Sequence, residues 1–172
     1  MPTIEELADQ VAALHRRVDH AESVLELHAL KARYGELVDQ RFSGGQLVDP
    51  DTLRTVTREA ANLFTPDGVW DGGPGLGRQV GRDAIAARLA EPTLTFSRHL
   101  FVKPFLAVDG DRARGRWDVL CPCRRSDGSS WWMCGYEDDE YARVDGTWLH
   151  RSMTLTTVFM TRVEQGWEKI LV

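Results

Sequence analysis

The sequence lacks long apolar segments, an excess of positive charge and a leader-like start. No apolar run approaches the ~18 residues that a transmembrane helix needs, so we expect no membrane partner. The first residues, MPTIEEL, have neither the basic start nor the apolar stretch of a signal peptide, and we expect a cytoplasmic protein. With 21 Lys and Arg against 26 Asp and Glu, the net charge is −5. That balance argues against a nucleic-acid partner.

Cysteine is also scarce, with three residues in the chain: Cys121, Cys123 and Cys134. Disulfide scaffolds are shorter and richer in cysteine. One residue separates the first two, whereas paired ligands of structural zinc sites are spaced by two or more. We therefore expect reduced, buried thiols in a strand and no metal site. No cofactor is expected.

What is present fits one globular domain of 172 residues, with helices in the first half. Residues 4–25 carry apolar side chains at a strict a/d heptad spacing, which predicts a helix with a narrow apolar seam. The seam could pack on the protein's own body or on another subunit. A second helix is expected over 23–38, with Ser23 as its N-cap and Glu26 completing a capping box. Two more are expected over 51–63 and 81–90.

The second half reads as strands over 100–108, 112–121, 130–144 and 147–160, separated by the turn signals DGD, SDG and DG. Helices followed by an antiparallel meander predict an α+β fold. A curved antiparallel sheet with helices on one face would enclose a pocket. The glycine-rich segment 72–77 has no phosphate-loop pattern and is expected to be a rim loop.

Two histidines lie in the strand region, and they are expected to differ. His99 opens a strand directly after the helix-to-sheet connection. His150 lies within the last strand, where alternation assigns Arg151 and Thr157 to the core side and His150 to the outer side. A structural role is therefore expected for His150. Asp39 ends a helix, where the macrodipole disfavours negative charge, and this hints at a special purpose.

Seven segments, taken in order, carry a resemblance to a known family. They are ARYGELVD (32–39), LFTPDGVW (63–70), GRDAI (81–85), RHL (98–100), VDGDRARG (108–115), YED (136–138) and DGTW (145–148). Together the chain resembles the SnoaL-like branch of the nuclear transport factor 2-like superfamily, and within it the bile acid 7α-dehydratases and, more distantly, scytalone dehydratases. The resemblance implies a cone-shaped α+β barrel over 23–162, an N-terminal helical extension over 1–22 and a C-terminal arm over 163–172.

The resemblance also implies a site. His99, Asp39 and Tyr34 match a histidine–aspartate dyad and its tyrosine, which would remove a proton next to a carbonyl without a metal. The family's functional arginine late in the last strand is replaced by Thr157, and Arg151 is expected on the same face. Aromatic residues suit a cyclic, apolar substrate. The expected substrate contacts are Trp70, Phe101, Trp117, Trp132, Arg151 and Thr157.

The function expected from this resemblance is a dehydratase or isomerase acting on a steroid-like or polyketide-like ring. A polyketide cyclase is an alternative, because the same residues could close a ring. So is a non-catalytic ligand-binding or oligomerisation module, since this fold hosts many functions. A dyad that meets inside an open cavity would favour the enzyme. A homo-oligomer, trimer or dimer, is expected from the seam and from the related dehydratases.

Overall fold

The computed structural model describes residues 1–163. The predicted arm over 163–172 lies outside the described residues apart from its first residue. Three helices and nine strands are present in the described part of the chain. The helices are α1 (Ile4–Asp39), α2 (Pro50–Asn62) and α3 (Arg82–Leu89). The strands are β1 (Phe42–Ser43), β2 (Gln46–Leu47), β3 (Phe64–Asp71), β4 (Arg78–Val80), β5 (Leu94–Ser97), β6 (Leu100–Asp109), β7 (Arg112–Arg125), β8 (Ser130–Val144) and β9 (Thr147–Val163).

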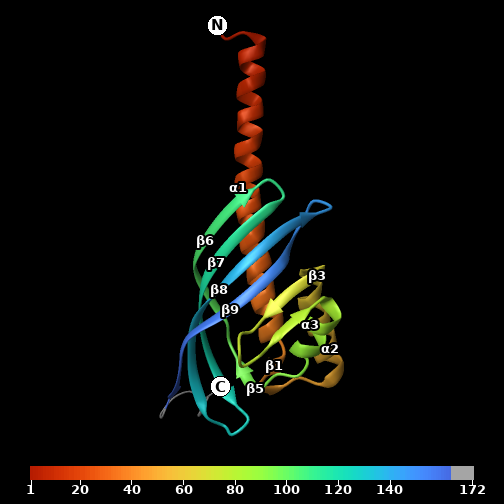
Figure 1. Cartoon of the computed structure of the whole chain (residues 1–172), viewed down its shortest axis with the longest axis vertical. Coiled ribbons are helices and arrows are strands. Elements are labelled where there is room, and N and C mark those ends of the chain that lie inside the picture. Colours follow the sequence, from red (N-terminus) through yellow and green to blue (C-terminus); the bar gives the residue numbers. More distant parts are fainter. Residues whose placement is uncertain (164–172) are drawn as a thin grey trace.

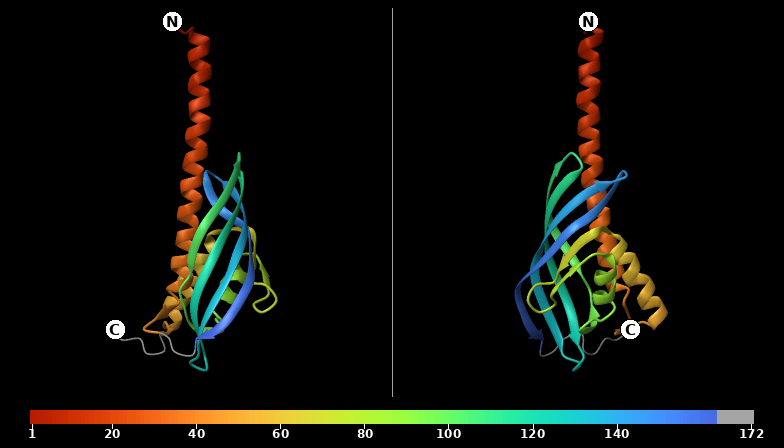
Figure 2. Two further views of the ribbon diagram at one scale, coloured as in Figure 1. Left: turned by 90° about the vertical axis from the view of Figure 1, so that its left-hand side faces the viewer. Right: turned by 45° about the vertical axis from the view of Figure 1, so that its right-hand side comes forward.

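The large sheet is strongly curved and packs against the helices, which confirms the predicted α+β fold (Figures 1 and 2). Its order is β4-β3-β9-β8-β7-β5, and β6 also pairs with β7. The pairings are antiparallel apart from β3 with β9, which is parallel. The long strands β6 to β9 form the predicted meander. Strands β1, β2, β4 and β5 are short elements that the sequence pattern did not predict.

The first helix differs from the expectation of two helices. It runs unbroken from Ile4 to Asp39 and begins at Thr3, which forms a capping box with Glu6. Ser23 is therefore not an N-cap: its hydroxyl donates to the carbonyl of Asp19 within the helix. The prediction was wrong because Ser can bond back to the preceding turn when no Gly or Pro breaks the helix. No helix within residues 1–163 is long and apolar enough to cross a membrane.

The N-terminal half of α1 extends beyond the sheet (Figures 1 and 2). Its seam does not pack on the protein's own body. Ile4, Leu7, Val11, Leu14 and Val18 are each about half exposed or more. The first of the two readings of the seam is thus wrong, and a row of apolar side chains faces away from the molecule.

The C-terminal half of α1 is buried and sets the position of the site. One core cluster joins Leu27 and Leu30 to Tyr141 and Trp148 of the sheet. A second cluster surrounds Tyr34 and includes residues of α2, α3, β3 and β9. Gly35 permits close approach, because a Cβ atom there would lie 3.2 Å from the ring of Phe101. The end of α1 is therefore held inside the curve of the sheet.

Candidate active site

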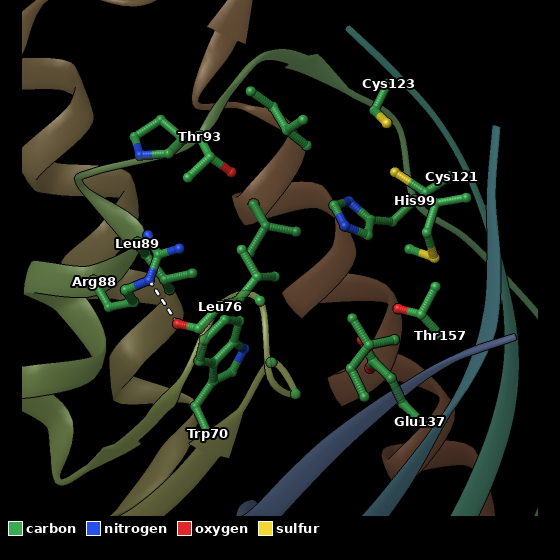
Figure 3. A pocket seen from close by; sticks show the side chains of 18 of the residues that line it. Trp70, Leu76, Arg88, Leu89, Thr93, His99, Cys121, Cys123, Glu137 and Thr157 are labelled. Carbon is green, nitrogen blue, oxygen red and sulfur yellow. Dashed lines mark hydrogen bonds between the residues drawn. The ribbon is translucent and has the colours of Figure 1, made fainter. Parts of the chain in front are cut away.

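A cavity of about 750 Å³ lies between the curved sheet and the helices. Helices α1 and α3, the glycine-rich segment 72–76 and strands β7, β8 and β9 contribute to its wall. Segment 72–76 thus forms part of the rim, as its composition predicts. Figure 3 shows His99, Glu137, Trp70 and Arg88 around the same space. The cavity is large enough for a drug-sized molecule.

His99 lines this cavity, and its side chain contacts Asp39. The Nδ1 atom of His99 lies 2.7 Å from Oδ1 of Asp39, and the backbone N–H of His99 donates to both carboxylate oxygens at 3.1 and 3.0 Å. The Asp39 side chain is 6% exposed and that of His99 17%. Because a carboxylate accepts, Nδ1 carries the proton, and Nε2 of a neutral ring is left as the basic nitrogen.

The chain positions this pair through two different elements. Asp39 is the last residue of α1, and His99 lies in the short link between β5 and β6. The hydrogen bonds from His99 offset the unfavourable placement of a carboxylate at a helix C-terminus. Phe101 follows on β6 and stacks on the imidazole, with ring centroids 5.9 Å apart. The ring is thus held on one edge and on one face.

Tyr34 lies one turn before Asp39 and also lines the cavity. Its hydroxyl oxygen accepts a hydrogen bond of 2.8 Å from Nε1 of Trp70. Burial, above all, raises the pKa of Tyr34. The phenol therefore remains protonated at neutral pH, and the bond from Trp70 leaves its proton free to be donated.

Lys31, Glu137 and Asp139 form a buried charge network beside the cavity that the sequence did not predict. Nζ of Lys31 lies 2.5 Å from Oε2 of Glu137 and 2.7 Å from Oδ2 of Asp139. Burial raises the pKa of Glu137, while the charge of Lys31 lowers it. Glu137 also lines the cavity. One signal could have revealed the network: Lys31 follows Leu27 by one turn on the face of α1 that Tyr34 continues.

His150 corrects a prediction. It is fully buried rather than on the outer side, and its ring packs against Tyr34, Phe64 and Tyr141. The pairing of β8 with β9 shifts by one residue between Tyr141 and Glu140, so Arg151 is an extra residue on β9. Such a bulge reverses the alternation.

The bulge also places Arg151 on the outer side of the sheet. Its side chain is exposed and lines a separate, smaller groove. The prediction that it shares the core side with Thr157 was therefore wrong. Beyond the bulge, Met153, Leu155 and Thr157 line the main cavity as predicted, but so do Thr156 and Met160 of the other predicted face, and a second register shift follows Thr157.

The expected substrate contacts divide into two groups. Trp70 and Thr157 line the cavity. Phe101, Trp117 and Trp132 do not. Phe101 supports the ring of His99. Trp117 is buried in the sheet, and Trp132 is half-buried on β8. Aromatic content alone could not separate cavity-lining from core residues.

The cysteines are free thiols, as predicted. Cys121 and Cys123 are buried on β7 and line the cavity, and Cys134 on β8 is partly buried. A hydrogen bond with Cys123, and then burial, raise the pKa of Cys121. Within residues 1–163, no three His, Cys, Asp or Glu side chains are grouped closely enough to hold a metal ion.

The chain matches one protein family and is similar to several solved structures. The model of the SnoaL-like domain family matches residues 19–154. No curated protein matches the sequence. A hexachlorocyclohexane dehydrochlorinase of LinA type3 from Novosphingobium barchaimii is 20% identical, with a TM-score of 0.71, and the match covers 86% of this chain and 94% of that chain.

Two further structures are similar. A protein proposed to be a scytalone dehydratase, from Novosphingobium aromaticivorans, is 20% identical over 86% of this chain and 91% of its own, with a TM-score of 0.68. A protein with a cystatin-like fold from the same organism is 22% identical over 92% of both chains, with a TM-score of 0.63. At these identities the similarity shows the fold alone.

Proposed function

The chain belongs to the SnoaL-like domain family, and we propose that it is a cofactor-independent lyase or isomerase that removes a proton from a cyclic, apolar small molecule. The observation that carries the proposal is the contact between Asp39 and His99 at a cavity of about 750 Å³. A binding module has no need of an imidazole oriented in this way.

In the proposed reaction, Nε2 of His99 takes a proton from the carbon next to a carbonyl group. Asp39 holds Nδ1–H and stabilises the imidazolium that forms. A positioned general base of this kind contributes roughly 10²–10⁴-fold to the rate. Proton transfer of this type needs only side chains.

Tyr34 supplies the complementary hydrogen bond. Its raised pKa keeps the phenol protonated, so it can donate to the carbonyl oxygen as negative charge develops there. Trp70 fixes the direction of that donor, because its Nε1–H occupies a lone pair of the phenol oxygen. In one enolisation, His99 therefore takes the proton from carbon while Tyr34 donates a hydrogen bond to the carbonyl oxygen.

The similar structures favour elimination as the outcome. One is named a dehydrochlorinase and another is proposed to be a scytalone dehydratase, and both names denote eliminations. Loss of a hydroxyl group from the neighbouring carbon as water, with the proton returned to the leaving oxygen by the imidazolium of His99, would make this protein a dehydratase. Return of the proton to another carbon would make it an isomerase, and attack on a second carbonyl would make it a cyclase.

Exchange of the α-proton for solvent deuterium tests the step that these outcomes share. Cyclic ketones and β-hydroxy ketones are incubated with the protein in D₂O, and exchange and elimination are followed by NMR. We expect catalysed exchange that His99→Ala abolishes and Tyr34→Phe lowers. A wild-type protein that binds these rings and exchanges no proton would instead favour the ligand-binding module.

A further inference from the structure

Two arginines line the cavity in addition to His99. Arg41 follows the end of α1 and is 8% exposed. Its Nε donates to the carbonyl of Val38 at 2.7 Å, and its Nη1 donates to the carbonyl of Leu89 at 3.0 Å. Arg41 lines the cavity together with His99. Its guanidinium is thus fixed by backbone carbonyls.

Arg88 on α3 is held in the same manner. Its Nε donates to the carbonyl of Leu76 at 3.1 Å, shown by the dashed line in Figure 3, and its Nη1 donates to the carbonyl of Glu91 at 2.6 Å. It also lines the cavity. Because Arg41 is bound to Leu89 and Arg88 is the preceding residue, the two guanidinium groups belong to one region of the wall.

Neither charge has an ion-pair partner within residues 1–163, although the charge of Asp39 acts on Arg41 from a longer distance. Over residues 1–163, no carboxylate oxygen lies within 4.0 Å of the nitrogens of Arg41 or Arg88, although other arginines of the chain have such partners. Burial lowers the pKa of Arg41, and the charge of Arg88 acts in the same direction. An arginine remains protonated even so. Two positive charges therefore lie in the wall, and within the described residues their side chains are hydrogen-bonded only to neutral carbonyls.

The carboxylates of the cavity are already engaged. Glu137 is paired with Lys31. Asp71 accepts the backbone N–H of Gly73. A third cation, Arg125, also lines the cavity, and its guanidinium lies 4.3 Å from the ring of Trp131. Three arginines thus line the cavity.

We propose that the region of Arg41 and Arg88 binds an anionic group of the ligand, a carboxylate or a phosphate, while the apolar ring of the ligand extends toward His99. The planar guanidinium suits both groups, since its N–H donors match two oxygens of one anion. Carbonyl partners fix the donors in advance, which reduces the cost of ordering them on binding. If the protein catalyses the proposed reaction, its substrate is therefore a cyclic compound that bears one acidic group. This statement about the substrate rests on the proposed function, whereas the anion site itself does not.

Binding without turnover provides the test, by isothermal titration calorimetry at neutral pH. The ligands are naphthoic acid, naphthyl phosphate and methyl naphthoate, which share a ring system and differ in charge. We expect at least one anion to bind the wild-type protein at least about tenfold more tightly than the neutral ester, as for a hydrogen bond to a charged group. The acid and the phosphate distinguish the two anion sources.

Arg41→Met and Arg88→Met should each reduce the affinity for the anion about tenfold and leave that for the ester unchanged. If Arg41→Met fails to fold, the same affinities are measured with Arg88→Met and with Arg41→Lys. Arg54→Met, at an exposed position on α2, removes the same charge outside the cavity and should keep the preference.

Three results would overturn the proposal: equal affinity of the wild-type protein for anion and ester, no binding of either anion, or a preference that survives in the folded Arg41 and Arg88 variants. His99→Ala should retain the preference for the anion. A protein that keeps this preference and yet catalyses no proton exchange would refute the proposed function while supporting the anion site.

Discussion

The carboxylate of Asp39 holds His99 at two points, the ring Nδ1 at 2.7 Å and the backbone N–H at 3.0 and 3.1 Å. The first contact sets the tautomer and the second fixes the link between β5 and β6. Asp39 is therefore both an electrostatic partner of the base and a structural support for it.

The first prediction separates these roles. Asp39→Asn keeps the shape but not the charge that stabilises an imidazolium, and we expect proton exchange to fall ~10²–10³-fold, as for a weakened general base. His99→Ala should cost at least as much. Both proteins should keep the circular dichroism spectrum of the wild type. His15→Ala, in the projecting part of α1, serves as the control, and a similar loss there would contradict the assignment.

The second prediction concerns acid stability. Burial lowers the pKa of His150 to about 3, from an ordinary value of 6.5. Between those values the unfolded chain binds a proton that the folded chain does not, so stability falls as the pH is lowered through this window. The loss is about 1.4 kcal/mol per pH unit, or about 2 kcal/mol between pH 6.5 and pH 5.

Urea unfolding at these pH values provides the measurement, with His150→Leu as the comparison. Leucine does not titrate, so the pH dependence of the variant should be weaker by that amount. It also removes two ring nitrogens that have no hydrogen-bond partner in the described structure. An unchanged pH dependence would show that His150 does not contribute to the acid sensitivity.

The third prediction concerns Lys31, which is fully buried beside Glu137 and Asp139. Lys31→Met leaves two carboxylates without their cation, and we expect a loss of ~3–5 kcal/mol in the free energy of unfolding. Lys103→Met, at an exposed pair with Asp118, should cost far less, because solvent screens an exposed pair. Denaturant unfolding measures both.

A second variant identifies the cause of that loss. Adding Glu137→Gln to Lys31→Met removes one of the unpaired charges and should restore part of the stability, because the two positions are in contact. If it restores none, the loss reflects packing and not charge.

The fourth prediction concerns the exposed seam of α1. β-Branched residues at the a positions with Leu at d favour a two-stranded coiled coil. Ile4, Val11 and Val18 alternate here with Leu7 and Leu14, so we propose that the seam joins two copies of the chain. Light scattering should give the mass of a dimer for the wild type and that of a monomer for the double variant Val11→Asp and Leu14→Asp.

Ala12→Asp places the same charge on another side of that helix and should leave the mass unchanged. A double variant that keeps the wild-type mass would exclude the seam as the contact between copies.

The sequence by itself determined the architecture of this protein. Turn residues and alternation in the long strands are local signals, and they predicted the meander and the α+β class. The order of the family segments predicted that Tyr34, Asp39 and His99 belong to one site. Asp39 and His99 are 60 residues apart, and their contact follows from the way that family's topology returns the β5–β6 link to the end of α1.

Only the tertiary structure decided the features that depend on one residue of register or on a partner far along the chain. A single extra residue on β9 turned His150 into the core and Arg151 out of it. Lys31 became a buried ion because Glu137 and Asp139 reach it from β8. Arg41 and Arg88 became a site candidate because backbone carbonyls, which no sequence pattern identifies, are their only protein hydrogen-bond partners in the described structure. Local patterns specify the elements, whereas burial and charge compensation depend on which elements come together.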